Sequence, residues 1–185
     1  MRPFAASSLD AEAVLAGHPS VRRARVDDLP RITEIYNQAV PERTATADTQ
    51  QRSVAERRVW FDRYRWDEGC PLVVWEEDGE VLAFAGAAPF RPGKQGYDGC
   101  NEVSLYCCQS ARGRGIGRRL GAGLVEACRA LNNRVLMALV FADNSRSNGL
   151  FARLGFQLCA HLPGVVLFPG PDSSPRDVGI WTLTL

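Results

Sequence analysis

A glycine- and arginine-rich segment at residues 111–119, ARGRGIGRR, limits the folds open to this chain. Residues 102–107 before it alternate apolar and polar side chains, which predicts a β-strand. After it, apolar side chains recur at helical spacing at Ile116, Leu120, Leu124, Cys128 and Leu131. A second, buried-type strand is expected at 135–142. This order predicts a right-handed crossover unit with two parallel strands.

The position of this segment between a strand and a helix indicates phosphate binding. Glycines let the backbone approach a ligand closely, and free N–H groups at a helix N-terminus favour an anion. A flexible turn with solvated arginines is the alternative. The segment lacks the Gly-Lys-Ser/Thr ending of a P-loop. It also fails the dinucleotide pattern G-x-G-x-x-G, because the third position falls on Arg118 or Leu120.

The rest of the chain predicts a mixed α/β or α+β fold. We expect an edge strand at 21–25, a helix that begins near Leu29, and a second helix at 54–64 with arginines on its outer face. Asp78-Gly79 between two apolar runs predicts a β-hairpin. A helix is expected at 145–154, and strands at 156–160, 165–168 and 178–185. Residues 1–20 are predicted to be an N-terminal extension of a single domain at 21–185.

Charge and cysteine usage exclude several classes of protein. The chain has 185 residues, 22 Lys plus Arg and 21 Asp plus Glu, so its net charge of +1 argues against a nucleic-acid binder. Six cysteines without C-x-x-C spacing, and two histidines, do not predict a metal site. Reduced thiols in a cytoplasmic protein are expected. No apolar run reaches 18 residues, so we expect no membrane span.

Arg112, Gly115 and Gly117 form the pattern R-x-x-G-x-G. This pattern resembles the acyl-CoA pyrophosphate loop of the GNAT N-acetyltransferase superfamily. Residues 144–156, with their Leu-Gly-Phe ending, resemble the next helix of that superfamily. Residues 35–40, 44–49, 89–92 and 177–181 are similar to phosphinothricin and methionine sulfoximine N-acetyltransferases, and the resemblance runs from about residue 21 to 185.

The resemblance implies one GNAT-like domain with a mixed central sheet, flanking helices and a splayed strand pair that binds acyl-CoA. Acetyl-CoA would be the acyl donor. The strand 105–107 would bind the pantetheine arm through its backbone, and the loop would wrap the pyrophosphate. The implied cofactor-binding residues are Leu105, Tyr106, Cys107, Arg112, Gly113, Arg114, Gly115, Ile116, Gly117, Arg118 and Asn144.

Glu102 matches the general base of the family. An amine attacks a thioester only as the free base, although ammonium dominates at neutral pH. An amine whose pKa lies two units above the ambient pH is only about 1% neutral, which costs roughly 2.7 kcal/mol. A carboxylate can remove that proton directly or through water. An exposed glutamate at a strand end is the alternative interpretation.

Residues 91–97 fall where these enzymes contact an amino-acid substrate. The implied substrate-binding residues are Arg91, Lys94, Gln95, Gly96 and Tyr97. Relatives commonly have Arg-Glu where this chain has Lys94-Gln95, and lysine lacks the bidentate fork of arginine. The loop at 164–177, with Pro169, Pro171 and Pro175, is longer than in the family. Relatives are often homodimers.

Phe151 stands where the superfamily usually has a Tyr or His that protonates the departing thiolate. If the alignment holds, its ring faces the sulfur and cannot donate a proton. The leading interpretation is an enzyme that acetylates a small amino-acid-like amine. A catalytically degenerate acyl-CoA-binding module is one alternative. A nucleic-acid-binding domain that uses the arginines of 112–119 is the other.

Overall fold

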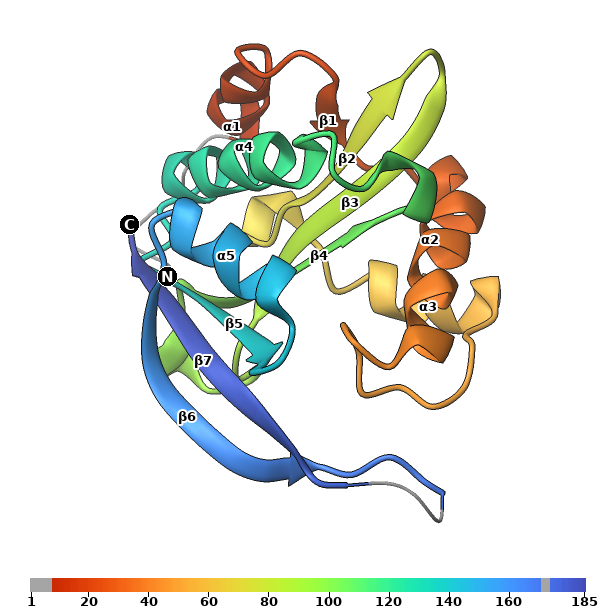
Figure 1. Ribbon diagram of the computed structural model, residues 1–185. Helices are drawn as coiled ribbons and strands as arrows, with labels where there is room; N and C mark the ends of the chain where they lie inside the picture. The colour runs from red at the N-terminus through yellow and green to blue at the C-terminus, as the bar shows by residue number, and fades with distance from the viewer. Residues whose placement is uncertain (1–7, 171–173) are drawn as a thin grey trace.

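The computed structural model describes residues 8–170 and 174–185, which build one seven-stranded sheet with flanking helices (Figure 1). The strand order is β1-β2-β3-β4-β5-β7-β6. In chain order the helices and strands are α1 (Ser8–Leu15), β1 (Val21–Arg23), α2 (Leu29–Glu42), α3 (Val54–Phe61), β2 (Leu72–Glu77), β3 (Glu80–Pro89), β4 (Cys100–Cys107), α4 (Ile116–Ala130), β5 (Val135–Phe141), α5 (Ser145–Arg153), β6 (Gln157–Val166) and β7 (Arg176–Thr184). The expected α+β class is confirmed.

Strands β4 and β5 form the one parallel pair among the described strands, and α4 connects them as the crossover unit predicted. Their pairing covers only residues 100–102 of β4, opposite residues 135–137 of β5. Beyond Glu102 the two strands separate, although β4 continues to Cys107 and β5 to Phe141. The splayed strand pair expected from the resemblance is therefore present.

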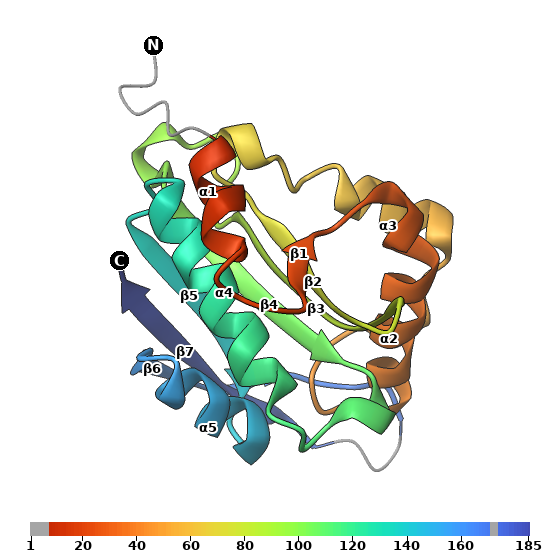
Figure 2. The ribbon, with the colours of Figure 1, turned by 90° about the horizontal axis from the view of Figure 1, so that it is seen from above.

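Opposite faces of the sheet carry different helices. Tyr106 of β4 packs edge-on against Tyr36 of α2, with ring centroids 5.0 Å apart, and Phe84 of β3 packs against Trp60 of α3. The next side chain, Leu105, instead lies against α4. Because successive side chains of a strand point to opposite faces, α2 and α3 cover one face at this point and α4 covers the other. Figure 2 shows α4 on one side of strands β2, β3 and β4, and α2 and α3 on the other side.

Helix α4 buries the apolar stripe that the sequence predicts. Leu120, Leu124 and Cys128 are fully buried, and Ile116 is 1% exposed. Gly121 gives the room for this packing, since a Cβ there would lie 2.6 Å from Leu154 Cδ1. Close packing of this kind fixes the start of α4 relative to β4.

Helix α1 was not expected from the sequence. It lies beside α4 in both views (Figures 1 and 2), and its Ala11 and Leu15 belong to the main hydrophobic core. His18, after the helix, lies 2.9 Å from Glu126 of α4. The described part of the predicted extension at 1–20 thus packs on the domain, while residues 1–7 lie outside the described residues.

The C-terminal strands differ from the prediction. Strands were expected at 156–160 and 165–168, but β6 runs continuously from Gln157 to Val166. The pairing of β6 with β7 shifts register between Leu162 and Val166. Pro163 and Gly164 lie within this irregular stretch. In the sequence these two residues indicated a break between two strands. Phe168 instead packs against Phe141 at 6.1 Å in a second small core, and Pro171 of the predicted long loop lies outside the described residues.

The structure also describes the apolar length of the helices and the state of the cysteine thiols. No helix within residues 8–170 and 174–185 is long and apolar enough to cross a membrane. Cys100, Cys107, Cys108, Cys128 and Cys159 are free thiols. Burial raises the pKa of the Cys107 thiol to about 11, so that thiol is protonated at neutral pH.

Candidate active site

Two cavities meet at strand β4. The first, about 610 Å³, lies between the loop that precedes α4, the end of α2 and the start of α5, and we name it the glycine-loop cleft. The second, about 660 Å³, lies between α3, β3 and β4 and contains Glu102, and we name it the Glu102 pocket. Both cavities lie along one strand because β4 separates from β5 beyond Glu102 and leaves space beside it.

Ten of the eleven residues predicted to bind the cofactor line the glycine-loop cleft. They are Leu105, Tyr106, Cys107, Arg112, Gly113, Gly115, Ile116, Gly117, Arg118 and Asn144. The sequence did not indicate the opposite wall, which comes from the end of α2, the loop after it, and α5. These residues are Ile35, Ala39, Glu42, Thr44, Ala45, Arg146, Ser147, Leu150 and Arg153.

The glycine loop has the geometry of an anion site. Gly113 and Gly115 have φ angles of +81° and +77°, and a Cβ at either would meet nothing within 4 Å. Gly115 is the N-cap of α4 and supplies no side-chain cap. The first N–H groups of a 15-residue helix are therefore available to a ligand, and the helix dipole favours negative charge there. These features fit a pyrophosphate.

Arg112 and Arg114 differ in where their side chains lie. The Nη1 atom of Arg112 lies 2.8 Å and 3.0 Å from the carboxylate oxygens of Glu42, across the cleft. Burial opposes ionisation of Glu42, but the hydrogen bonds from Arg112 and Gln109 hold its pKa below the usual value. Arg114 instead pairs with Glu77 of β2 at 2.5 Å and does not line the cleft. This placement does not support the prediction for Arg114.

Asn144 serves the local structure as well as the cleft. Its side-chain oxygen caps α5 by accepting a hydrogen bond from the Ser147 N–H at 3.0 Å. Its Nδ2 donates to the Thr44 carbonyl oxygen at 2.8 Å and so joins the loop after α2 to α5. Two walls of the cleft are thereby tied together at this residue.

The edge of β4 that faces the cleft is open. The residues of β4 beyond Glu102 pair with β3 on one side, but the pairing with β5 has ended. Backbone amide groups of a strand without a neighbouring strand can bind an extended ligand as a sheet would. This edge fits the amide-containing pantetheine arm expected from the resemblance.

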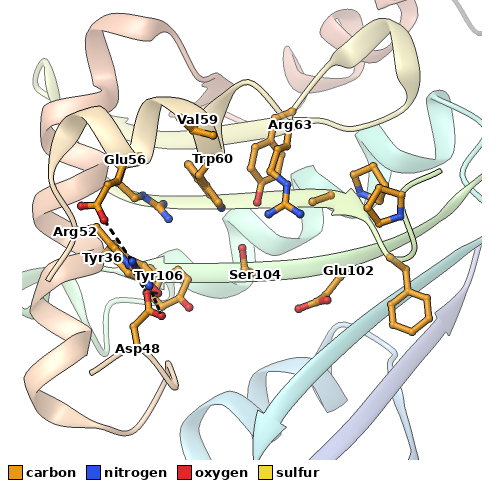
Figure 3. Close-up of a pocket in the computed structure, with 16 residues that line it drawn as sticks. Tyr36, Asp48, Arg52, Glu56, Val59, Trp60, Arg63, Glu102, Ser104 and Tyr106 are labelled. Carbon is orange, nitrogen blue, oxygen red and sulfur yellow. Dashed lines mark hydrogen bonds and ion pairs between the residues drawn. The ribbon is translucent and has the colours of Figure 1, made fainter. Parts of the chain in front are cut away.

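The Glu102 pocket is built on one face of β4. Figure 3 shows Glu102, Ser104 and Tyr106 along the strand, with Arg63 and Trp60 on the side of α3. The Glu102 side chain is exposed by surface area but lies within the concave pocket. Partial loss of solvent raises the pKa of Glu102, and the nearby positive charge of Arg63 opposes that rise. A carboxylate in this position can accept a proton from a ligand in the pocket.

Arg57 is a buried cation that the sequence did not indicate. It was expected on the outer face of its helix, but it is 5% exposed and lines the Glu102 pocket. Its guanidinium lies 3.4 Å from the Trp60 ring centroid and 4.4 Å from that of Tyr36. Its Nε and Nη2 atoms are buried without a hydrogen-bond partner among the residues that the structure describes. Burial lowers the pKa of Arg57, and an anion in the pocket would compensate this charge.

A hydrogen-bonded wall closes one end of the Glu102 pocket. The Tyr36 hydroxyl lies 2.7 Å from Asp48 Oδ2 and 2.8 Å from Thr46 Oγ1. Arg52 donates to both oxygens of Asp48 at 2.9 Å, and this pairing, with the Tyr36 bond, lowers the pKa of Asp48 despite partial burial. Asp48 is therefore already paired. Glu102 is the carboxylate in the pocket that receives no hydrogen bond from a described residue.

The predicted substrate-binding residues lie beside the pocket and not in it. Phe90 and Pro92 line the Glu102 pocket, whereas Arg91, Lys94, Gln95, Gly96 and Tyr97 do not. All five are exposed. Tyr97 packs on Phe90 at 5.8 Å, and Gln95 lines a different cavity near the end of α4. Contact between these residues and a substrate stays a prediction.

Phe151 is not at the cleft. It is 6% exposed and packs edge-on against Phe156 at 5.1 Å in the main core. Its neighbour Leu150 lines the glycine-loop cleft, but Phe151 does not. The helix turns this side chain toward the core, and the expectation that its ring faces the sulfur stays a prediction. Within the part of the chain that the structure describes, no cluster of three His, Cys, Asp or Glu side chains is placed to hold a metal ion.

Comparison with known proteins gives a consistent result. The model of the acetyltransferase (GNAT) family matches residues 30–156. The chain is 39% identical over 147 residues to the L-methionine sulfoximine/L-methionine sulfone acetyltransferase of Pseudomonas aeruginosa, covering 79% of this chain and 84% of that one. It is 37% identical over 138 residues to the phosphinothricin N-acetyltransferase of Alcaligenes faecalis, covering 74% and 69%. A phosphinothricin acetyltransferase from Sinorhizobium meliloti, solved with AcCoA, superposes with a TM-score of 0.82 at 32% identity, covering 89% of this chain and 87% of that one.

Proposed function

This chain belongs to the acetyltransferase (GNAT) family, and from that premise we propose that it transfers the acetyl group of acetyl-CoA to the amine of a small amino acid. The observation that carries the proposal is the meeting of two cavities on one strand. The glycine-loop cleft fits the acyl donor, and the Glu102 pocket holds a carboxylate that can deprotonate an amine. Acetyl-CoA supplies the activated thioester.

We propose that the backbone and the arginines of the glycine-loop cleft hold the donor. The free N–H groups at the start of α4 and the charge of Arg112 and Arg118 attract the pyrophosphate. The open edge of β4 at 105–107 receives the pantetheine amides. Together they aim the acetyl end of the donor along β4 toward the Glu102 pocket.

Glu102 acts as the general base in this proposal. Its carboxylate accepts a proton from the substrate ammonium, directly or through one water, and so produces the amine that attacks. Burial raises the pKa of Glu102, which makes its carboxylate a stronger base than that of an ordinary glutamate. The hydrogen-bonded Asp48 is a weaker candidate, because its pKa is lowered and both oxygens are engaged.

The charges in the Glu102 pocket favour an acceptor that carries a carboxylate beside its amine. Arg57 is buried without a hydrogen-bonded anion, and Arg63 lies close enough to act on Glu102. An α-amino acid places a carboxylate two bonds from the nitrogen, so one ligand satisfies both kinds of charge. The relatives named for methionine sulfoximine and phosphinothricin act on amino acids of this type, and we propose the same class here.

The alternatives have less support. A degenerate acyl-CoA-binding module would not need an unpaired carboxylate in a pocket next to the donor cleft. A nucleic-acid-binding surface would need a basic excess, whereas the net charge of the chain is +1 and Arg114 pairs with Glu77 outside the cleft. Arg119 lies over the Trp75 ring at 4.5 Å.

The test is a thiol-release assay with acetyl-CoA and a panel of amines. The panel contains the twenty common amino acids, phosphinothricin, methionine sulfoximine and polyamines, each paired with its decarboxylated analogue where one exists. The proposal predicts CoA release with one or more amino acids, and a lower kcat/KM with the matching amine that lacks a carboxylate. Release with polyamines alone, or binding of acetyl-CoA without release over the whole panel, would contradict it.

We also infer a cytoplasmic, homodimeric protein. The free thiols favour a reducing compartment. Exposed apolar side chains on β5 and β6, at Leu139, Leu158 and Val165, are available to a second copy. Light scattering on the purified chain tests the dimer: a monomeric mass across micromolar concentrations would contradict it.

A further inference from the structure

We propose that the Tyr106 hydroxyl donates a hydrogen bond to the sulfur that leaves during acetyl transfer, and so stabilises the negative charge that develops there. The inference rests on the proposed function, since it concerns the same site. The sequence left water, Ser147 and Tyr106 open as the group that serves the leaving sulfur, and the structure favours the Tyr106 side chain.

The place of Tyr106 between the cavities is the first argument. Among the described residues, it alone lines both the glycine-loop cleft and the Glu102 pocket. The bond that breaks joins the donor's sulfur to the acetyl group that the amine attacks. That bond must therefore lie where the donor cavity meets the acceptor cavity, which is where the ring of Tyr106 stands.

The orientation of the hydroxyl is the second argument. It donates to the Ala45 carbonyl oxygen at 3.3 Å, and Ala45 lines the glycine-loop cleft. The tip of the side chain thus lies at the cleft, on the side of the donor. A separation of 3.3 Å is long for an O–H···O hydrogen bond, so the hydroxyl hydrogen can turn to a stronger acceptor at little cost.

The ring is held in place by two aromatic neighbours. It stacks on Phe84, with centroids 5.3 Å apart and planes at 24°, and meets Tyr36 edge-on at 5.0 Å. Both partners come from elements that are part of the main core. A donor fixed in this way needs little reorganisation when charge develops beside it.

The chemistry balances without any further group. The amine nitrogen forms a bond to the acetyl carbon, the carbon–sulfur bond breaks, and its electron pair stays on sulfur. Glu102 passes the ammonium proton to water before the attack, and it then accepts the second proton, which nitrogen loses as the amide forms. Tyr106 keeps its own proton, and the CoA thiolate takes a proton from solvent after release. Burial raises the pKa of Tyr106 well above its usual value, so the hydroxyl stays a neutral donor over the working pH range.

Other side chains on or beside the glycine-loop cleft are weaker candidates. Phe151 lies in the core and carries no donor. Cys107 lines the cleft, but a thiol is a weak hydrogen-bond donor. Ser147 also lines the cleft and lies on α5, away from the Glu102 pocket.

The direct test measures binding and does not depend on turnover. The affinities of CoA and of desulfo-CoA, which lacks the thiol, are measured by calorimetry at pH 7 and pH 9.5. The thiolate fraction of CoA is small at pH 7 and rises strongly by pH 9.5, because the thiol of CoA ionises in the alkaline range. For the wild-type chain, the ratio of CoA to desulfo-CoA affinity should rise about tenfold between the two pH values, because a hydrogen bond to a charged group is worth about 1.5–3 kcal/mol. No rise in this ratio in the wild-type chain would overturn the proposal without any variant.

Tyr106→Phe should remove most of that rise while its desulfo-CoA affinity stays the same. Tyr36→Phe is the matched control: it removes a hydroxyl from the same aromatic cluster, but Tyr36 lines only the Glu102 pocket. It should keep the wild-type rise. An equal rise in Tyr106→Phe and wild type, or an equal loss in both variants, would show that the Tyr106 hydroxyl does not contact the sulfur.

Kinetics give the second measurement. With the best amine of the panel, Tyr106→Phe should lower kcat about ten- to a hundredfold with little change in the KM for acetyl-CoA. An unchanged kcat in a folded variant would overturn the proposal. If the wild-type chain releases no thiol with any amine, the proposed function fails, whereas the pH-dependent affinity of CoA still reports on Tyr106 alone.

Discussion

Arg112 and Arg114 stand two positions apart in one loop, yet only Arg112 lines the glycine-loop cleft. Arg112 reaches across the cleft to Glu42, while Arg114 pairs with Glu77 at the end of β2. Both carry the same charge at nearly the same place in the sequence. Comparing variants of these two arginines therefore distinguishes a specific contact with the donor from a general electrostatic attraction of anions.

Replacing each arginine by methionine should affect donor binding differently. Arg112→Met should weaken acetyl-CoA binding about tenfold or more, because a hydrogen bond to a charged group contributes about 1.5–3 kcal/mol. Arg114→Met should change the affinity less than about threefold. Calorimetric titration at fixed ionic strength measures both. Equal losses in the two variants would mean that the loop attracts the donor only through its net charge.

Gly115 allows a test of charge at constant size. Its φ angle of +77° is one that Asn and Asp tolerate better than other residues, and a Cβ there meets no atom within 4 Å. Gly115→Asn and Gly115→Asp should therefore fold alike. The Asp variant should bind acetyl-CoA at least about tenfold more weakly than the Asn variant, because its charge would lie where the pyrophosphate binds. Thermal shifts with acetyl-CoA provide the measurement, and equal shifts would place the pyrophosphate elsewhere.

The pH dependence should follow the balance between Arg63 and burial at Glu102. Burial raises the pKa of Glu102 and Arg63 lowers it, and Glu102 must be ionised to accept a proton. Removing the charge with Arg63→Gln raises that pKa further, so the acid limb of kcat/KM moves to higher pH. At a pH on the acid limb, kcat/KM divided by the plateau value of the same protein should be roughly two- to fivefold lower in Arg63→Gln than in the wild type.

Arg63→Lys is the control for this prediction, since it keeps the charge. Its acid limb should stay near that of the wild type. A limb that moves to lower pH in Arg63→Gln would show that the ionisation it reports does not belong to Glu102.

Core packing behind the glycine loop should set the stability of the domain. Leu124 of α4 is fully buried, and Leu167, directly after β6, is 65% exposed. Leu124→Ala should lower the free energy of unfolding by about 2–5 kcal/mol. The same truncation at Leu167 should stay within about 0.5 kcal/mol. Denaturant unfolding of both variants compares them, and similar losses would contradict the exposure of Leu167.

Local patterns in the sequence predicted the crossover unit and the wall of the glycine-loop cleft that the loop itself forms. The helix stripe from Ile116 to Cys128 and the glycines before it lie within one short stretch of chain, where spacing indicates the local structure. Glu102 was singled out by the family resemblance, and it lies on the strand that leads into the loop.

Residues that enter the site from distant elements could not be predicted in this way. Glu42 and Ala45 reach the cleft from the end of α2 and the loop after it, and no spacing relates them to residues 105–118. Arg57 did carry a signal: it stands three residues before Trp60, on the same helical face. An arginine on that face was taken as solvated, because burial of an unpaired charge is costly and therefore rare.

The burial of Phe151 could not be predicted from spacing either. The family resemblance put this position beside the sulfur, but phenylalanine has no polar group to keep at the cleft, and it packs with Phe156 inside the core. The loss of a donor at that position leaves Tyr106 as the hydroxyl between the two cavities.

The replacement of Glu102 by glutamine tests the central claim most directly, because it removes the base at nearly constant size and leaves the glycine-loop cleft untouched. Acetyl-CoA affinity is measured by calorimetry, and kcat with the best amine is followed by thiol release from pH 6 to pH 9. The proposed mechanism predicts that kcat falls about 10²–10⁴-fold while acetyl-CoA affinity stays the same. A Glu102→Gln variant with wild-type rates across this pH range would contradict the role of Glu102 as the base.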